Sequence, residues 1–307
     1  MTKSIGLVGC GRWGSNHLNV LQRFRAEGLI ERIVVCDVDP IKLRGLEVDA
    51  SYTSFKEALQ RETLDAVAVV TPPDSHLWLM EQALERALPV LVEKPLSDNH
   101  DALKRTLATL HKGAQIMVGY LLRHHPGMHA LRTHINAGLV GEVVSVTYVR
   151  TTRRTRPKGA EPVKTLAVHG LDIVAWLLSS PLMEMTTNAA EKHEDSAEIR
   201  LETKQGKTGV IKVGWNWEDE ERRIVVAGKT GSQIMFDFGT GELTSVNLLE
   251  NFGNPSSLFG SETVPYKSEA LEEEWRAFLE RNQSSKPYVF PPLDTLLDQS
   301  AWIEKYG

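Results

Sequence analysis

The feature that most constrains this chain is a glycine-rich turn between an apolar segment and a helical pattern. Ile5-Gly6-Leu7-Val8 predicts a buried strand, Gly9-Cys10-Gly11-Arg12-Trp13-Gly14 follows, and apolar residues then recur at helical spacing over 18–24. The first glycine permits a tight turn, Gly11 leaves room for a pyrophosphate against the backbone, and Gly14 lets helix and strand pack closely. The amino end of a helix also attracts phosphates. In this context the motif predicts dinucleotide binding rather than a glycine-rich turn alone.

The second predicted strand, residues 32–36, ends at Asp37. A carboxylate at this position accepts hydrogen bonds from both ribose hydroxyls of the adenosine and repels a 2′-phosphate. No arginine follows Asp37 immediately, so the sequence favours NAD over NADP as the cofactor. The alternative is that Asp37 only caps the turn Val38-Asp39-Pro40, which aspartate does well.

Two further apolar segments run into polar motifs. Residues 65–71 precede Pro72-Pro73-Asp74-Ser75-His76 and a helix, and Val90-Leu91-Val92 runs into Glu93-Lys94-Pro95. Strands joined by a crossover helix lie parallel, and ligands bind at the carboxyl ends of parallel strands. A lysine there can also simply mark where a strand meets solvent. The residues expected to face one ligand site are Thr71, Pro72, His76, Glu93 and Lys94.

Together these motifs resemble the glucose–fructose oxidoreductase and inositol dehydrogenase family (Gfo/Idh/MocA). The resemblance rests on residues 9–17, on Thr-Pro-x-x-x-His at 71–76 and on Glu-Lys-Pro at 93–95. It implies that Lys94 lies beside the nicotinamide and the substrate carbinol, that Glu93 helps to position the cofactor, and that the Lys94–Pro95 bond is cis. It also implies that Thr71, Pro72 and His76 line the cofactor.

The residue types agree with hydride transfer from a carbinol. That reaction needs a group that takes or steers the hydroxyl proton, and a partly buried lysine such as Lys94 can do either. The hydride chemistry itself belongs to the nicotinamide.

The length of 307 residues predicts two domains of an α/β protein. A helix after Ser97 and a strand over 115–119 complete six strands in the order 3-2-1-4-5-6, so we expect a Rossmann domain over 1–122. Residues 123–307 are expected to form an α+β domain for substrate binding and oligomerisation. Short glycine-containing turns between consecutive strands predict a largely antiparallel, open sheet. Its predicted strands cover 143–149, 197–203, 207–216, 222–228 and 232–238, and helices are expected over 269–282 and 293–306.

An amphipathic helix over 165–178 carries the candidate catalytic residue of the second domain. His169 matches a family histidine that exchanges the substrate proton, whereas the aspartate that the family has four residues earlier is Thr165 here. A threonine forms hydrogen bonds but holds no negative charge beside an imidazolium. The resemblance also places Arg123 at a position that often meets substrate. The alternative for His169 is a hydrogen-bonded core histidine.

Five cations occur within nine residues, namely Arg150, Arg153, Arg154, Arg156 and Lys158. Such runs usually form solvated loops. The alternative is that Arg153 and its neighbours neutralise a phosphate or carboxylate of the substrate, as a nucleotide-sugar would supply.

His125 and His129 have the i, i+4 spacing of metal ligands. However, we expect Pro126 to begin a helix that leaves His125 outside it, and no cysteine or carboxylate cluster completes a ligand set. The sequence therefore predicts no metal.

Composition excludes other classes of protein. A net charge of −5 argues against nucleic-acid binding, and no apolar run is long enough for a membrane span. Cys10 and Cys36, the two cysteines, fit a reducing, cytoplasmic location. In the family the open sheet face makes subunit contacts, which implies a homodimer or homotetramer.

These observations predict an NAD-dependent dehydrogenase or reductase of carbohydrate metabolism. Its expected substrate is a secondary alcohol of a sugar, nucleotide-sugar or cyclitol, on which Lys94 and His169 act. Thr165 leaves a second hypothesis open, a cofactor-binding regulator or scaffold that has lost turnover.

Overall fold

The computed structural model describes residues 3–246, 270–284 and 286–307. The chain divides into two compact units, Met1–Tyr120 with Leu271–Ser300, and Leu121–Ala270 with Ala301–Gly307. Within the described ranges, no helix combines the length and the apolar character that a membrane crossing requires.

The first unit is built on a seven-stranded parallel sheet in the order β14-β6-β5-β4-β1-β2-β3. Residues of β4 and β5 are buried throughout, as expected for parallel strands that are covered on both faces. The predicted order of the first six strands is confirmed. The strands are β1 (Ser4–Val8), β2 (Arg32–Cys36), β3 (Ala50–Tyr52), β4 (Ala66–Val69), β5 (Val90–Val92), β6 (Gln115–Val118) and β14 (Tyr288–Phe290).

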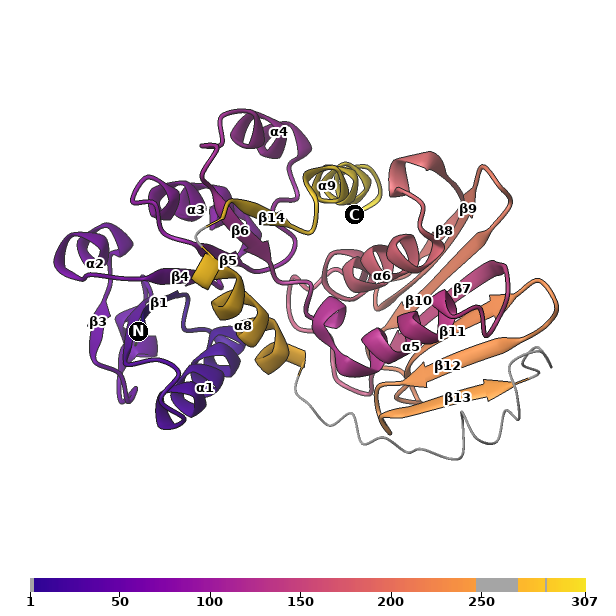
Figure 1. Ribbon diagram of the computed structural model, residues 1–307, viewed down its shortest axis with the longest axis horizontal. Helices are drawn as coiled ribbons and strands as arrows, with labels where there is room; N and C mark the ends of the chain where they lie inside the picture. Colours follow the sequence, from indigo (N-terminus) through magenta and orange to yellow (C-terminus); the bar gives the residue numbers. More distant parts are fainter. Residues whose placement is uncertain (1–2, 247–269, 285) are drawn as a thin grey trace. The chain divides into compact units, whose positions relative to one another are not determined.

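Helices and short turns connect these strands (Figure 1). Ser54 and Asn99 accept backbone hydrogen bonds at the amino ends of α2 and α4, which explains where these helices begin. The elements are α1 (Arg12–Ala26), η1 (Pro40–Leu43), α2 (Phe55–Arg61), η2 (Pro73–Ser75), α3 (His76–Leu84), α4 (His100–Ala108), α8 (Ala270–Arg281) and η7 (Asn282–Ser284).

The C-terminal segment 271–300 corrects the predicted domain boundary. The expectation that residues 123–307 form one domain is wrong here, because β14 pairs with β6 and α8 packs in the core of the first unit. Trp275 and Phe278 of α8 share that core with Phe24 of α1, and Figure 1 shows α8 beside α1. Helix α8 begins where predicted, although Glu269 lies outside the described residues.

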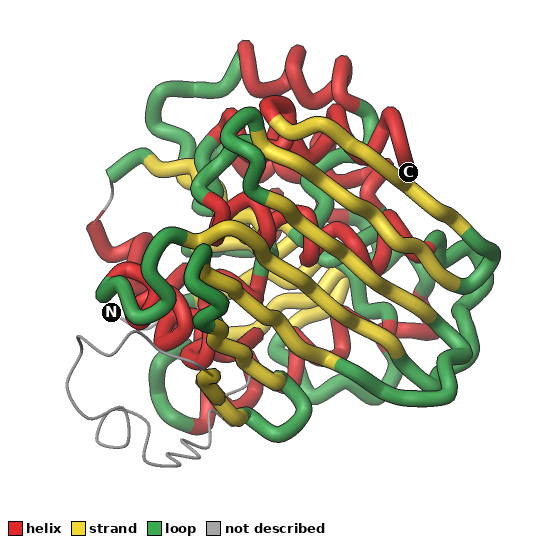
Figure 2. Tube along the Cα trace, turned by 90° about the vertical axis from the view of Figure 1, so that its right-hand side faces the viewer, coloured by secondary structure: helices red, strands yellow, loops and turns green. Residues whose placement is uncertain are grey.

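The second unit contains a seven-stranded sheet in the order β13-β12-β11-β7-β10-β9-β8 (Figure 2). Its pairs are antiparallel except for β7 with β10, so the prediction of a largely antiparallel sheet is confirmed. Strand β7 lies between β10 and β11, which are therefore not neighbours. The strands are β7 (Val143–Thr151), β8 (Met185–Lys192), β9 (Ser196–Thr203), β10 (Thr208–Gly214), β11 (Arg222–Gly228), β12 (Gln233–Asp237) and β13 (Glu242–Val246). The sequence analysis missed β8 and β13.

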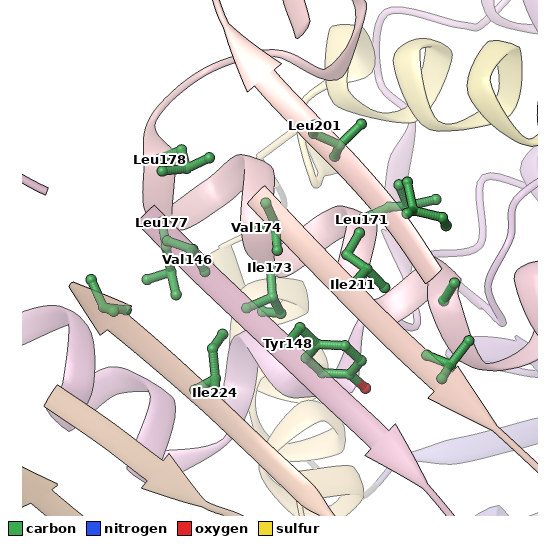
Figure 3. Close-up of a cluster of buried hydrophobic side chains, with 14 of the residues drawn as sticks. Val146, Tyr148, Leu171, Ile173, Val174, Leu177, Leu178, Leu201, Ile211 and Ile224 are labelled. Carbon is green, nitrogen blue, oxygen red and sulfur yellow. The ribbon is translucent and has the colours of Figure 1, made fainter. Parts of the chain in front are cut away.

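Helices cover one face of this sheet. Figure 3 shows Ile173, Val174 and Leu177 of α6 packed among side chains of β7 and β10. The prediction that this helix is amphipathic is wrong, because nine of its eleven residues are buried. Trp215, which follows β10, also belongs to this core. The elements are η3 (Leu121–His124), α5 (Pro126–Asn136), η4 (Val163–Ala167), α6 (Val168–Leu178), η5 (Leu182–Glu184) and α9 (Leu293–Tyr306), the last divided between the two units.

Candidate functional site

The glycine turn between β1 and α1 has the shape of a phosphate cradle. A Cβ on Gly9 would lie 2.3 Å from the Val70 carbonyl oxygen, and one on Gly14 would lie 2.0 Å from the Gly9 carbonyl oxygen. By contrast, a Cβ on Gly11 would meet nothing within 4 Å. Gly11 is also the N-cap of α1 and provides no side-chain cap, so the first amides of the helix can bind an anion. Close packing at two glycines and open space at the third fit a bound pyrophosphate.

Asp37 lies beside this turn at the end of β2 and is buried. Its Oδ2 accepts a hydrogen bond from the Cys10 amide at 2.8 Å, and its Oδ1 accepts one from the Asp39 amide at 2.9 Å. The predicted capping role is therefore present. Each carboxylate oxygen has a second lone pair, so ribose binding is compatible with it. Lys42 Nζ lies 3.5 Å from Oδ1. A cation therefore lies beside Asp37, although it is not adjacent to Asp37 in the sequence.

His76 connects the loops that follow β4 and β5. Its Nε2 lies 2.7 Å from the Thr71 carbonyl oxygen and its Nδ1 lies 2.9 Å from the Pro95 carbonyl oxygen. Burial lowers the pKa of His76, while the two carbonyl oxygens oppose that shift. Because the ring is fully buried, His76 supports these two loops rather than offering a surface to a cofactor. Thr71 is half-buried and accepts a hydrogen bond from Ser75, and Pro72 is exposed.

Glu93 and Lys94 occupy the end of β5. Glu93 is buried, and its Oε1 accepts hydrogen bonds from the indole of Trp13 at 2.7 Å and from His17 Nε2 at 3.1 Å. Its Oε2 accepts the Lys94 amide at 3.1 Å. Burial alone would raise the pKa of Glu93, but the hydrogen bond from His17, with the charge of Lys94 and the hydrogen bond from Trp13, lowers it overall. Lys94 is half-buried, and the predicted cis Lys94–Pro95 bond is confirmed.

The first unit thus brings the predicted cofactor residues to the carboxyl ends of β1, β2, β4 and β5. Trp13, exposed over 39% of its surface, connects the glycine turn to the Glu93 carboxylate. Arg12 is exposed at the first position of α1. The sequence analysis missed the roles of His17 and Trp275, whose indole donates to His17 Nδ1 at 3.1 Å.

In the second unit, His169 lies near the start of α6 and is buried. A π-helical turn, η4, precedes it, which the sequence analysis had read as regular α-helix. Thr165 lies in that turn, and its hydroxyl donates to the Glu161 carbonyl oxygen at 2.6 Å. The Thr165 oxygen is thus engaged with the backbone of the preceding turn. A π turn changes the facing of residues four apart, so the spacing of Thr165 and His169 differs from that of an ordinary helix.

Arg123 forms a buried ion pair with Asp172, one helical turn after His169. Its Nε and Nη2 each lie 2.8 Å from an Asp172 carboxylate oxygen. These two guanidinium nitrogens are therefore engaged within the protein, which weakens the expectation that Arg123 contacts substrate. The sequence analysis missed Asp172 as the partner. The available signal was a carboxylate in a helix that is otherwise apolar, because a buried charge requires a counter-charge.

Part of the cationic segment 150–158 is held by neighbouring residues, some of them acidic. Arg153 Nε donates to the Glu218 carbonyl oxygen at 2.8 Å, and Arg156 forms ion pairs with Glu194 and Asp195 at 2.9 Å. Arg154 and Lys158 are exposed. This pattern favours the interpretation as a solvated, ion-paired loop for most of the segment.

The histidines near α5 have a structural role. Helix α5 begins at Pro126 as predicted, and His125 is its N-cap, with Nδ1 accepting the Gly127 amide at 3.1 Å. Burial lowers the pKa of His125 to about 4, and the nearby His129 makes a smaller contribution in the same direction. Among the residues that the structure describes, no three histidine, cysteine, aspartate or glutamate side chains are grouped so that they could hold a metal.

Comparisons with known proteins agree with this description. A family profile for "Oxidoreductase family, NAD-binding Rossmann fold" matches residues 3–120, and a profile for the "GFO/IDH/MocA C-terminal domain" matches residues 128–234. Inositol 2-dehydrogenase 1 of Saccharopolyspora erythraea is 29% identical over 231 residues, which cover 69% of this chain and 67% of that protein.

Two solved structures share the fold. The WlbA dehydrogenase from Bordetella pertussis, in complex with NADH and UDP-GlcNAcA, matches with a TM-score of 0.79 at 19% identity, covering 99% of this chain and 94% of that chain. KijD10, a 3-ketoreductase from Actinomadura kijaniata in complex with NADP and TDP-benzene, matches with a TM-score of 0.78 at 18% identity, covering 99% and 96%.

Proposed function

The chain belongs to the Gfo/Idh/MocA oxidoreductase family, and from this premise we propose that it is an NAD-dependent dehydrogenase or reductase. Its proposed substrate is a secondary alcohol, or the matching ketone, of a sugar, nucleotide-sugar or cyclitol. The observation that carries the proposal is the end of β5, where Lys94 follows a buried, triply hydrogen-bonded Glu93 in the unit that holds the glycine turn. The inositol and nucleotide-sugar enzymes among its relatives suggest the substrate class.

Residues of the first unit are proposed to hold the dinucleotide. The first amides of α1 bind the pyrophosphate over Gly11, and Asp37 accepts the ribose hydroxyls. Thr71 and Pro72 line the cofactor, and the buried His76 holds their loop through its contact with the Thr71 carbonyl oxygen. When bound, the nicotinamide supplies or accepts the hydride.

Two residues are proposed to handle the substrate proton. Lys94, half-buried at the strand end, takes or steers the proton of the reacting hydroxyl. His169, at the start of α6, is proposed to exchange the substrate proton. Thr165 has no negative charge with which to stabilise a protonated imidazole. Both roles follow from the residue type and from the family to which the chain belongs.

Kinetics with a panel of inositols, sugars and nucleotide-sugars test this function directly. Lys94→Met keeps the length of the side chain and removes its charge, so we expect kcat to fall by on the order of 10²–10⁴ while NAD affinity stays close to normal. His169→Ala should also lower kcat, by a smaller factor. The matched control is Lys56→Met on α2, where the lysine is exposed. Unchanged hydride transfer in both Lys94→Met and His169→Ala would remove these residues from the catalytic assignment. A wild type that binds NAD but turns over no member of the panel would favour the non-catalytic regulator.

We also propose that the open face of the second sheet joins subunits. Alternate residues of each strand point to that face. The strand register places four of them in one row across β10, β7, β11 and β12, namely Val210, Thr147, Val225 and Met235. These four side chains are half-buried and keep part of their contact with solvent, and three of them are apolar. Val225→Asp should shift the molar mass measured by light scattering from that of an oligomer to that of a monomer. A wild-type protein that is already monomeric would exclude this proposal.

A further inference from the structure

A buried cluster of polar side chains lies behind the Glu93 carboxylate in the first unit. We call it the Glu93 cluster, and it comprises Trp13 and His17 of α1, Glu93 after β5, and Glu274 and Trp275 of α8. His17, Glu274 and Trp275 are completely shielded from solvent. Helix α8 comes from the C-terminal part of the chain. Its residues Glu274 and Trp275 therefore lie close to Glu93, which is about 180 positions earlier in the sequence.

The hydrogen bonds determine which nitrogen of His17 carries the proton. An indole N–H only donates, so the 3.1 Å contact from Trp275 Nε1 requires an unprotonated Nδ1 on His17. The proton of the neutral ring must then lie on Nε2, from which it is donated to Glu93 Oε1 at 3.1 Å. A doubly protonated imidazole would place two N–H groups against each other at Trp275. The geometry therefore selects the neutral Nε2–H form.

Glu274 is an unusual residue in this surrounding. Both of its carboxylate oxygens are buried and have no hydrogen-bond partner among the described residues. An ionised carboxylate in that condition is far more costly than a neutral carboxylic acid. Burial, and then the charge of Glu93, raise the pKa of Glu274 well above its ordinary value. When two carboxyl groups are buried close together, ionisation of one disfavours ionisation of the other, so the pair favours a state with one negative charge.

The orientation of Glu93 is fixed by packing as well as by hydrogen bonds. A Cβ added to Gly119, which follows β6, would lie 3.0 Å from Glu93 Oε1 and 3.3 Å from Oε2. The carboxylate therefore lies flat against that backbone. The ionisable groups that act on it are His17 of α1, His76 of α3, Lys94 beside it in the chain and Glu274 of α8.

We propose that Trp275 is a positioning residue for the catalytic strand end and that Glu274 beside it carries no charge. Trp275 holds His17 as the neutral Nε2–H tautomer, and Glu274 remains a neutral acid. Glu93 then carries the single negative charge of the cluster. Its Oε1 accepts hydrogen bonds from Trp13 and His17 of α1, and its Oε2 accepts one from the Lys94 amide. The proposal rests on the proposed function only in assigning the end of β5 to catalysis.

Nuclear magnetic resonance of protein labelled with ¹⁵N-histidine tests the His17 tautomer without any substrate. The chain has ten histidines, and His17 is assigned by the signal that disappears in His17→Gln. We expect a protonated Nε2 and an unprotonated Nδ1, as the two hydrogen bonds require. In Trp275→Phe the Nδ1 loses its donor, so the Nδ1–H tautomer should appear beside the Nε2–H tautomer. The matched control is Trp78→Phe, because Trp78 is an exposed tryptophan of the same unit.

Infrared difference spectroscopy tests the charge of Glu274. The carbonyl stretch of a protonated carboxylic acid should disappear in Glu274→Gln and persist in Glu280→Gln, which changes an exposed glutamate on the same helix. This measurement needs no Trp275 variant, so it remains informative if Trp275→Phe does not fold.

The His17 tautomer separates positioning from a general structural role. In Trp275→Phe we expect kcat to fall on the order of tenfold, as for loss of one hydrogen bond, together with the appearance of the Nδ1–H tautomer. A fall in kcat with an unchanged His17 tautomer would overturn the positioning role. A wild-type His17 protonated on Nδ1, or the absence of the Glu274 carbonyl band, would overturn the proposed charge states. If no substrate is turned over but both spectra are as expected, the proposed function fails while the charge assignment stands.

Discussion

Arg123 holds Asp172 through a bidentate ion pair that is buried within the second unit. Nε lies 2.8 Å from Oδ2 and Nη2 lies 2.8 Å from Oδ1. The pair joins η3, where the second unit begins, to α6, and Asp172 lies one helical turn after His169. The ion pair therefore fixes the part of α6 that presents the candidate catalytic histidine.

Removing the charge of Asp172 should destabilise the protein strongly. Asp172→Asn leaves the Arg123 guanidinium buried without its counter-charge, and such a change costs about 3–5 kcal/mol. The double variant Arg123→Met, Asp172→Leu should recover most of that loss, because it removes both charges. Denaturant unfolding measures the stability of both variants, with removal of the exposed pair of Lys229 and Glu142 as the control. A loss below about 1 kcal/mol in Asp172→Asn would contradict the buried pair, because that is the cost typical of exposed pairs.

The stability of the second unit should fall in weak acid because of His125. Its pKa in the folded protein is lowered to about 4 from 6.5, so the unfolded chain binds the extra proton between these values. The free energy of unfolding should therefore decrease as the pH falls from about 6.5 to about 4. His125→Asn keeps an N-cap acceptor for the Gly127 amide but cannot titrate in this range. The variant should show a smaller decrease in melting temperature over that interval.

His111→Asn provides the control for this experiment. His111 Nδ1 accepts the Gly113 amide at 2.9 Å, the same i to i+2 bond as in His125, but His111 is exposed. Its replacement should leave the pH dependence of the melting temperature unchanged. Equal slopes for the wild type and His125→Asn would show that His125 is not responsible.

Cofactor choice should depend on Asp37 and Lys42 together. Asp37→Ala should weaken NAD binding and relieve the repulsion of the NADP 2′-phosphate, and Asp37→Asn should separate the charge from the hydrogen bond to the Cys10 amide. Lys42→Met removes the cation 3.5 Å from Oδ1, so it should increase the preference for NAD. Calorimetric titration with both dinucleotides measures these changes. A wild type that binds NADP as tightly as NAD would show that Asp37 does not set the choice.

The cations of 150–158 should affect catalysis only if the substrate is anionic. Arg154→Ala with Lys158→Ala removes two exposed cations of the segment and should then raise KM several-fold, with an effect that decreases at high salt. Arg153→Ala should have less effect, because Arg153 is held by Glu218 and lies 4.0 Å from Asp219. Steady-state kinetics with a neutral cyclitol and with a nucleotide-sugar compare the two cases. No change in KM for a substrate that bears phosphate would assign the whole segment to a solvated loop.

The sequence by itself determined the features that depend on short stretches of chain. Alternating apolar segments and crossover helices gave the order of the first six strands, because parallel strands and their connections follow regular rules. The turn at 9–14 was readable because its glycines lie between a strand pattern and a helix pattern, and because Gly14 packs against the Gly9 carbonyl oxygen of the same turn. Pro126 likewise marks the start of α5 by its own backbone restriction.

Only the tertiary structure decided which distant groups meet. Residues 271–300 return to the first unit, β7 inserts between β10 and β11, and α6 is buried on nearly all sides. Trp275 and His17, 258 positions apart, are hydrogen-bonded, as are Arg123 and Asp172. A buried polar group must find a partner, but the chain topology rather than the neighbouring sequence determines which partner is within reach.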